Sequence, residues 1–294
     1  MERKVISFDT EQEWLQLRKQ NVNSTEVSAI LGLSPYMTLS ELWHLKKNNI
    51  EQAFQETERM TLGKRLEQPI MEHFAEIKGW SVEPYKKYGL IPELRLGSSF
   101  DAIILEQKAL LEIKNVDYFI HKQQWDQDEA TPYIELQVQT QMLVSGLDKL
   151  YIAALVGGND LKIIERDADP ETQDAIVEGV RKFWNSINND TPPEFDFVKD
   201  SDFIKRLYDK VDGTVIESED LYSLAVRYKD FAIMEAEAKE QKEAVKSEIL
   251  TMIKSAEKVK GSRYSISAGI VNKEPYMVKA QSYRNFRVTL RGDK

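Results

Sequence analysis

The stretch GSSFDAIILEQKALLEIK, residues 97–114, decides how this chain folds around its candidate site. Two apolar segments flank a short polar turn at 106–108, a pattern typical of a β-hairpin. Because side chains alternate along a strand, Glu112 and Lys114 point to one face of the second strand and Ile113 points to the other. Antiparallel pairing then brings Asp101 of the first strand beside Glu112.

Two interpretations of this hairpin are open. Two carboxylates held close together repel each other unless a cation lies between them, and their oxygens suit Mg²⁺. The backbone carbonyl of Ile113 could supply a further oxygen, and Lys114 could position or deprotonate a water that attacks a phosphate. The other interpretation is a surface hairpin with a Glu–Lys pair on one face, which the spacing alone favours.

The segments around the hairpin predict an α/β fold. Polar capping residues followed by apolar residues at helical spacing mark helices, and short apolar runs between turn residues mark strands. Predicted helices begin after Thr10, at Ser24 and after Thr38, and run over 61–77, 133–146 and 170–188. Predicted strands are 80–84, 88–91, 96–105, 109–114, 150–156 and 161–165. This order of elements predicts a mixed sheet flanked by helices.

The last third of the chain has a different character. Residues 218–258 contain no proline or glycine, and apolar residues from Leu221 to Ala256 recur near heptad spacing, interrupted by Glu235 and Lys242. We predict a helix of about 60 Å that packs on itself, on the core or on another subunit. We predict that this helix ends at Gly261 and that two paired strands follow it, 264–270 and 286–290.

Charge is unevenly distributed along the 294 residues. There are 40 Lys and Arg against 49 Asp and Glu, a net charge of −9. Residues 258–294 carry nine basic and two acidic residues, a balance of +7, which leaves −16 for residues 1–257. An acidic body argues against a nucleic-acid partner, and a basic tail argues for one unless the tail is only a solvated end.

Several classes of protein are excluded. The chain has no cysteine, so disulfides, thiolate metal sites and cysteine nucleophiles are absent. It has no run of about 18 apolar residues, and its first residues lack the apolar region of a signal peptide, so we predict no membrane association. His44, His73 and His121 do not have the spacing of metal ligands. A cytosolic enzyme or binding protein remains.

Five motifs in order give the chain a family resemblance. Asp101-x(10)-Glu112-x-Lys114 resembles the PD-(D/E)xK nuclease motif, and the other four resemble the lambda-exonuclease and YqaJ-like viral recombinase family of that superfamily. Those four are Trp14-x-x-Leu17-Arg18, the run from Ser24 to Tyr36, Gly63-Lys64-x-x-Glu67 and Gln137-Val138-Gln139. The resemblance covers roughly residues 10–200 and implies a restriction-endonuclease-like fold, a mixed central sheet flanked by helices.

The resemblance implies a role for individual residues. Asp101, Glu112 and the carbonyl of Ile113 correspond to metal ligands, Lys114 to the catalytic lysine, and Glu67 to the glutamate that serves a second metal or its water. The residues that correspond to a phosphate-binding pocket are Arg18, Thr25, Ser99 and Gln137. A guanidinium and short hydroxyls suit phosphate oxygens.

The turn at Asn21-Val22-Asn23-Ser24 departs from the glycine-rich turn of the family. Asparagine tolerates positive φ better than most residues, so we expect the turn to survive with asparagine in place of glycine.

The implied activity is a Mg²⁺-dependent 5′-to-3′ exonuclease, with Mn²⁺ as a substitute, acting on double-stranded DNA ends that carry a 5′ phosphate. Its 3′ single strand would pass to a single-strand annealing recombinase of phage-type recombination in the cytoplasm of a bacterial host. The resemblance also implies a homo-oligomeric ring, with a trimer favoured. We predict three parts: a nuclease core over 1–200, a helical extension over 201–258 and a basic β tail over 259–294. Two alternatives are an endonuclease of restriction or repair and a non-catalytic DNA-end-binding scaffold.

Overall fold

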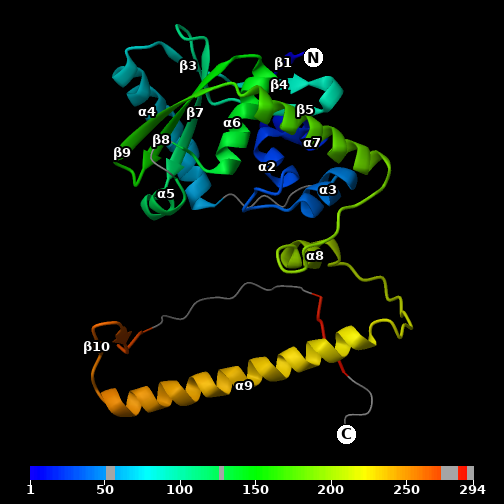
Figure 1. The fold of residues 1–294 in the computed structure, drawn as a ribbon, viewed down its shortest axis with the longest axis vertical. Helices are drawn as coiled ribbons and strands as arrows, with labels where there is room; N and C mark the ends of the chain where they lie inside the picture. The colour runs from blue at the N-terminus through cyan, green and yellow to red at the C-terminus, as the bar shows by residue number, and fades with distance from the viewer. Residues whose placement is uncertain (51–56, 126–128, 273–283, 290–294) are drawn as a thin grey trace. The chain divides into compact units, whose positions relative to one another are not determined.

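The chain divides into two compact units, residues 1–204 and 205–294 (Figure 1). The computed structural model describes residues 1–50, 57–125, 129–272 and 284–289. The first unit contains the predicted hairpin and all the residues proposed for the site. The second contains a long helix and a small hairpin.

Helices of the first unit begin where the capping residues predict. Thr10 Oγ1 accepts the N–H of Glu13, and Thr38 Oγ1 accepts the N–H of Glu41. The helices are α1 (Glu11–Gln20), α2 (Val27–Ile30), α3 (Leu39–Lys47), α4 (Glu58–Lys78), α5 (Tyr118–Gln124), α6 (Pro132–Ser145) and α7 (Pro170–Asn188), with 3₁₀ turns η1 (Ser24–Glu26) and η2 (Pro92–Leu94). A further helix, α8 (Ser201–Leu207), contains the boundary between the two units. The six predicted helices are confirmed, and α5 and α8 were not predicted.

Five strands form the central sheet in the order β3-β6-β7-β8-β9. They are β3 (Val82–Pro84), β6 (Ala102–Ile104), β7 (Ala109–Val116), β8 (Lys149–Val156) and β9 (Asp160–Asp167). β7 and β8 are parallel, and the other neighbours are antiparallel. A parallel pair needs a long crossover, and α5 and α6 lie in the segment that provides it.

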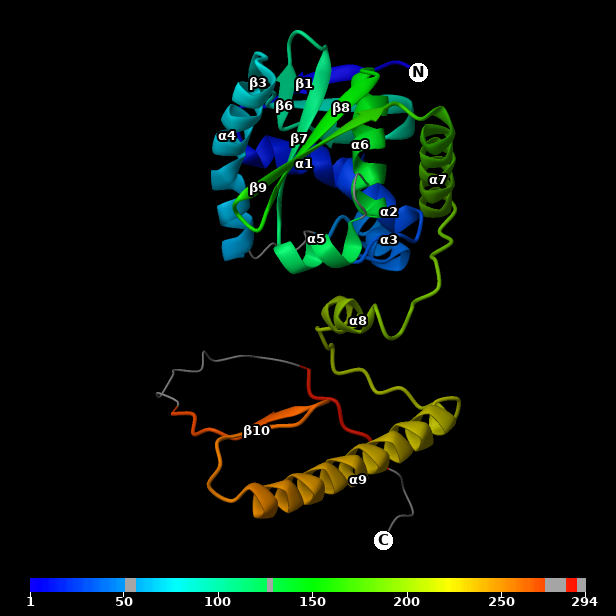
Figure 2. The same cartoon turned by 60° about the vertical axis from the view of Figure 1, so that its left-hand side comes forward.

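Alternation along β7 builds a core on each face of this sheet. Ile113 packs in one core with Phe74 of α4, and Leu110 belongs to the larger core with Met142 of α6. Figure 2 shows α4 on one side of the sheet and α6 with α7 on the other. Both faces of β7 are therefore covered, and its polar residues Glu112 and Lys114 lie on the α6 side.

A second sheet has the order β1-β4-β5-β2. Its strands are β1 (Lys4–Ser7), β2 (Val22–Asn23), β4 (Lys87–Ile91) and β5 (Leu96–Ser99). The predicted single strand 96–105 is wrong, because the chain leaves this sheet after Ser99 and enters the central sheet at Ala102. Phe100 turns into the larger core, and Asp101 lies at the break.

In the second unit, α9 (Tyr222–Ile253) is shorter than the predicted helix, and the residue that follows it, Lys254, has a φ of 50°. The predicted pairing of 264–270 with 286–290 is wrong for the described residues. Instead, β11 (Ser265–Ser267) pairs with β10 (Lys258–Lys260). A hydrogen bond from the N–H of Gly261 to the carbonyl of Tyr264 closes this short hairpin, and a short loop costs less entropy than a long one. Residue 290 lies outside the described residues.

Across the described ranges, no helix combines the length and the apolar character that crossing a membrane requires.

Candidate active site

Asp101 and Glu112 face each other where the pairing of β6 with β7 ends. The last pair is Ala102 with Leu111, and continuing this register by one residue places Asp101 opposite Glu112. Oδ2 of Asp101 accepts the backbone N–H of Ile113 at 2.8 Å. The predicted juxtaposition of the two carboxyl groups is therefore present in the fold.

The edge of β7 beyond Leu111 is open on the β6 side. Because the N–H and C=O of one residue point to the same side of a strand, the carbonyl of Ile113 points to the side on which its N–H meets Asp101. That carbonyl therefore faces the Asp101 side, where the resemblance implies a metal ligand.

Glu112 is buried and is surrounded by nitrogen donors. Its side chain is 3% exposed, and its two oxygens accept the Nε2–H groups of two α6 residues, Gln137 on Oε1 and Gln141 on Oε2, each at 2.7 Å. Nζ of Lys114 lies 2.5 Å from Oε1 and also donates to Oε1 of Gln137 at 3.1 Å. Gln137 thus contacts both members of the Glu112–Lys114 ion pair rather than standing apart from them.

These groups perturb one another's protonation. Desolvation and the charge of Glu112 raise the pKa of Asp101 well above its ordinary value. Burial opposes the charge of Lys114, but the charges of Glu112 and Asp101 and the hydrogen bond to Glu112 leave its pKa raised. Strong mutual perturbation of this kind is typical of functional sites.

Glu67 approaches the pair from α4. Desolvation, and then the charge of Glu112, raise the pKa of its carboxyl, while Lys64 and Lys114 oppose that shift. Glu67 also contributes to the raised pKa of Asp101. Helix α4 and strand β7 therefore bring the predicted third carboxylate into electrostatic contact with the other two.

The donor set fits a hard divalent cation better than a softer metal. All the candidate ligands are oxygens, as Mg²⁺ and similar ions prefer. Within the described part of the chain, no three His, Cys, Asp or Glu side chains are grouped closely enough to hold a metal by themselves. A bound ion would thus rely on Asp101 and Glu112, on the Ile113 carbonyl and on oxygens of water or substrate, as Mg²⁺ sites at phosphates do.

Three of the four predicted phosphate-binding residues are linked through Trp14. Nη2 of Arg18 donates to Oγ1 of Thr25 at 3.3 Å, and the Arg18 guanidinium lies over the Trp14 ring, 4.9 Å from its centroid. The Trp14 Nε1–H donates to Oγ of Ser99 at 2.7 Å. Gln137, the fourth, lies at the ion pair instead.

The turn that carries Thr25 survives for a different reason from the one expected. Asn21 and Asn23 have φ values of −123° and −103°, so neither uses the left-handed region and the prediction of positive φ is wrong. Hydrogen bonds hold the turn instead. Nδ2 of Asn23 donates to the carbonyl of Arg18 at 2.8 Å, and the buried Lys46 Nζ donates to the carbonyls of Arg18 and Asn21 at 2.9 and 2.7 Å.

Sequence reasoning missed Gln141 and Lys46. Gln141 is 2% exposed and joins the two parts of the site, since its Nε2 donates to Glu112 and, at 3.3 Å, to the carbonyl of Ser99. Its position four residues after Gln137 places it on the same helix face, a signal that the sequence contains. Its Oε1 is buried without a hydrogen-bond partner among the described residues. Lys46 gave no signal, because its partners, two backbone carbonyls and the side chain of Glu26, lie in a distant segment.

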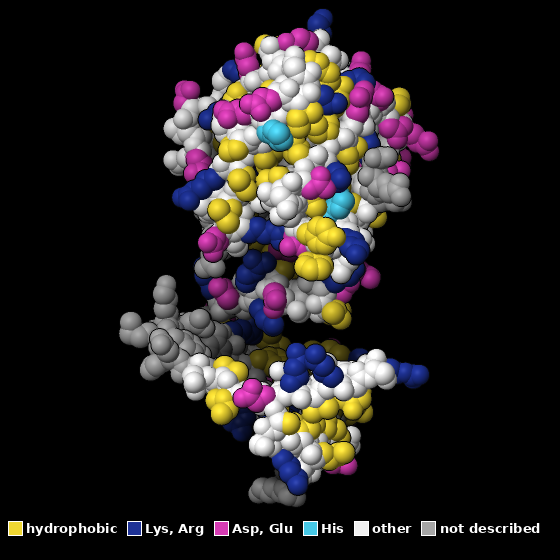
Figure 3. All heavy atoms as spheres, turned by 90° about the vertical axis from the view of Figure 1, so that its left-hand side faces the viewer, with side chains coloured by type: hydrophobic (Ala, Val, Ile, Leu, Met, Phe, Trp, Pro, Cys, Tyr) yellow, Lys and Arg dark blue, Asp and Glu magenta, His cyan; other side chains and the backbone are white. Residues whose placement is uncertain are grey.

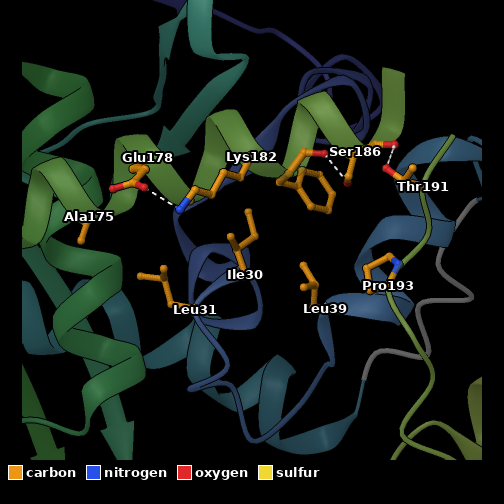
Figure 4. A pocket seen from close by; sticks show the side chains of 11 residues that line it. Ile30, Leu31, Leu39, Ala175, Glu178, Lys182, Ser186, Thr191 and Pro193 are labelled. Atoms are coloured by element: carbon orange, nitrogen blue, oxygen red, sulfur yellow. Dashed lines mark hydrogen bonds and ion pairs between the residues drawn. The ribbon is translucent and has the colours of Figure 1, made fainter. Parts of the chain in front are cut away.

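A separate apolar hollow of about 520 Å³ lies beside α7, lined by α2, α3 and α7 (Figure 4). Its apolar lining includes Ile30, Leu31, Leu39 and Phe183, and none of the predicted site residues lines it.

Comparisons with known proteins confirm the resemblance drawn from the five motifs. Residues 13–148 match the family model of the YqaJ-like viral recombinase domain. The uncharacterized protein YqaJ of Bacillus subtilis (strain 168) is 26% identical over 248 residues, which cover 81% of this chain and 77% of that protein.

Solved structures confirm the fold class. The alkaline exonuclease LHK-Exo of Laribacter hongkongensis is 16% identical, with a TM-score of 0.50 over 66% of this chain and 98% of that chain. The same enzyme in complex with dAMP is 18% identical, with a TM-score of 0.50 over 67% and 97% of the two chains. At these identities the likeness concerns the fold.

Proposed function

Since residues 13–148 match the family model of the YqaJ-like viral recombinase domain, we propose that this chain is a metal-dependent deoxyribonuclease that degrades double-stranded DNA from its ends. The observation that carries the proposal is the group formed by Asp101, Glu112 and Lys114 at the open edge of β7. A surface Glu–Lys pair would not need a buried glutamate held by two glutamines. The fold, which resembles that of an alkaline exonuclease, is compatible with this activity.

Mg²⁺ is the proposed metal, with Mn²⁺ as a substitute, held by Asp101, Glu112 and the Ile113 carbonyl, with Glu67 serving a second ion or its water. When bound, such ions polarise the phosphate and lower the pKa of an attacking water. Lys114, which lies at hydrogen-bond distance from Glu112 and Gln137, is proposed to orient the water and to offset phosphate charge.

Arg18, Thr25 and Ser99 form the proposed pocket for the terminal 5′ phosphate. The guanidinium offers a fork of donors, and the two hydroxyls offer short donors from different elements. The stacking of Arg18 on Trp14 fixes the guanidinium before substrate arrives. Gln137, in contact with both Glu112 and Lys114, is proposed to hold the scissile phosphate side of the site.

The biological role we propose is 5′-to-3′ resection that leaves a 3′ single strand for a single-strand annealing recombinase. Copies of the chain would form a ring around DNA, with a trimer favoured. A basic channel with acidic outer surfaces would reconcile the net charge of −9 with a DNA substrate. The proposed setting is phage-type recombination in the cytoplasm of a bacterial host.

Digestion of three substrates with Mg²⁺ tests the proposal: a 5′-phosphorylated linear duplex, a 5′-hydroxyl linear duplex and a covalently closed circle. We expect the phosphorylated linear DNA to disappear fastest and the circle to survive. A label on either end of one strand reports the polarity. Lys114→Ala is the inactive control, and full activity of that variant would contradict the mechanism.

The other outcomes identify the alternatives. Cutting of the closed circle would indicate an endonuclease. If no substrate is cut with Mg²⁺ or Mn²⁺, the result would support the other interpretation of the hairpin, a Glu–Lys ion pair without a catalytic role, and a non-catalytic DNA-binding protein.

A further inference from the structure

Helix α9 is a long helix that exposes many large apolar side chains. It spans 32 residues, and none of them is buried. Figure 3 shows hydrophobic side chains exposed on the second unit. Five of the large ones on α9, with their exposed fractions, are Leu224 (54%), Tyr228 (49%), Phe231 (62%), Val245 (55%) and Met252 (78%). Exposed apolar side chains in this number mark an interaction surface.

Some of the exposed apolar residues follow a heptad pattern, whereas Ile233, Met234 and Leu250 lie outside it. Taking Leu221 as position a and Leu224 as position d, the later a positions are Tyr228, Glu235, Lys242 and Ile249, and the later d positions are Phe231, Ala238, Val245 and Met252. This spacing is that of a two-stranded coiled coil. Within the chain, the ring of Tyr228 contacts the ring of Phe286, with 5.3 Å between their centroids, and Tyr228 is still 49% exposed.

We propose that α9 pairs with α9 of a second copy of this chain, in antiparallel orientation. Because such a pair has two-fold symmetry, in a trimeric assembly it would join copies that belong to two different rings. The two charged core positions decide the direction. In a parallel pair, Glu235 would lie beside the partner's Glu235, and Lys242 beside the partner's Lys242, which places like charges together twice. In an antiparallel pair with its two-fold axis between residues 236 and 237, Glu235 lies one turn from the partner's Lys242. By symmetry, Lys242 lies one turn from the partner's Glu235, so opposite charges are neighbours twice.

The flanking positions favour the same direction. In this register Arg227 lies within about one helical turn of the partner's Glu248, which gives an ion pair at each end of the interface. A parallel pair would instead place Arg227 near the partner's Ala232, without a charge partner. Opposite charges beside an antiparallel seam are the usual means of fixing orientation.

The same register matches the apolar ends of the two helices. Leu224 lies opposite the partner's Ile249, and Tyr228 lies opposite the partner's Val245. Phe231 covers the stem of the partner's Lys242, whose charge reaches the rim of the seam. The charged middle therefore lies between two apolar ends, and both ends are covered at once.

The absence of cysteine from the chain makes the proposal directly testable. Full-length Leu224→Cys and Ile249→Cys proteins are prepared separately, mixed under mild oxidation and analysed on non-reducing gels with mass spectrometry. We expect a disulfide between the two variants in the mixture. Neither variant should cross-link alone, because copies of residue 224 lie about 37 Å apart along an antiparallel seam, far beyond the reach of about 7 Å of a disulfide.

The control is Glu240→Cys, on the outer face of α9, which should not cross-link with either variant. Cross-linking of Leu224→Cys with itself would overturn the antiparallel orientation. Absence of any cross-link in the mixture above the Glu240→Cys background would overturn self-pairing.

A charge exchange gives a second measurement. Glu235→Lys alone and Lys242→Glu alone place like charges one turn apart, so each should weaken self-association through α9 about tenfold or more. The double variant restores the opposite pairs and should restore association, as measured by sedimentation. A double variant no better than either single one would contradict the pairing. These measurements do not depend on nuclease activity, so their failure leaves the proposed function untouched.

Discussion

The backbone N–H of Ile113 donates a 2.8 Å hydrogen bond to Oδ2 of Asp101, so a side chain takes the place that a strand carbonyl would hold in the sheet. Pairing of β6 with β7 ends there, and the carboxylate of Asp101 is fixed opposite Glu112. One hydrogen bond to the backbone therefore positions Asp101, a candidate metal ligand.

Replacement of Asp101 by Asn separates position from charge. The Asn oxygen can still accept the Ile113 N–H, so we expect the fold to persist. Loss of the negative ligand should reduce DNA cleavage at least about a hundredfold, because metal assistance is worth several kcal/mol. Initial rates on linear duplex, with circular dichroism as the check on folding, measure both. Unreduced cleavage would show that Asp101 is not a metal ligand.

Metal-free protein should become less stable as pH rises, in part because of Asp101. Its pKa is raised in the folded state by desolvation and by Glu112, so above about pH 4 the folded chain holds a proton that the unfolded chain has lost. Stability from this group is therefore present at acidic pH and is lost as pH rises through the raised pKa. In EDTA, the free energy of unfolding of Asp101→Asn minus that of the wild type should increase from pH 4 to pH 8. An unchanged difference would contradict the assignment.

Gln141→Leu should weaken metal binding about 10- to 100-fold, because outer ligands of this kind orient the carboxylate that binds the ion. Its Nε2 holds Oε2 of Glu112 at 2.7 Å. Calorimetric titration with Mn²⁺ measures the affinity. Gln139→Leu is the matched control, since Gln139 is buried on the same helix but donates to the carbonyl of Asp167. Equal losses in the two variants would assign Gln141 a structural role only.

Arg18→Ala should remove most of the preference for a 5′ phosphate. The expected change is about tenfold or more in the ratio of kcat/KM for phosphorylated over hydroxyl duplex, from the loss of a charge-assisted contact. Arg181→Ala, an exposed substitution on α7 with the same change of charge, is the control. If both variants lower the rates on the two substrates equally, Arg18 contributes only general attraction to DNA.

Lys46→Met should destabilise the first unit by about 3–5 kcal/mol, because it removes the counter-ion of the partly buried Glu26 and one donor to each of two carbonyls. Lys46 Nζ lies 2.8 Å from Oε2 of Glu26, and its side chain is 6% exposed. Urea unfolding measures the change. The neighbouring Lys47→Met breaks the more exposed pair with Asp190 and should cost about 0–1 kcal/mol. Similar losses for the two variants would contradict the importance of burial.

The hairpin and its ion pair were predictable from the sequence because they depend on local alternation and short turns. Side chains two apart on one strand must share a face, which brings Glu112 and Lys114 together in any fold that contains β7. The helices were predictable for a similar reason, since Thr10 and Thr38 bond to residues three positions away.

What could not be predicted depends on distant partners. The chain passes from one sheet to the other at Phe100 and Asp101. The alternation of side chains over 96–105 contains no signal of this change. Lys46 stabilises a turn that lies 20 or more residues earlier in the chain. The end of α9 at Ile253 depends on the pairing of β10 with β11, because residues in that hairpin cannot also continue the helix.

The break between β5 and β6 also bears on what the enzyme would release. Ser99, in the pocket proposed for the terminal phosphate, and Asp101, proposed to bind metal, are separated by one residue of the same chain. Two residues span at most about 7 Å, so the backbone itself limits how far the held end of a strand can lie from the bond that is cut. If both assignments hold, the enzyme would release fragments of one uniform size at every step, whatever the DNA sequence.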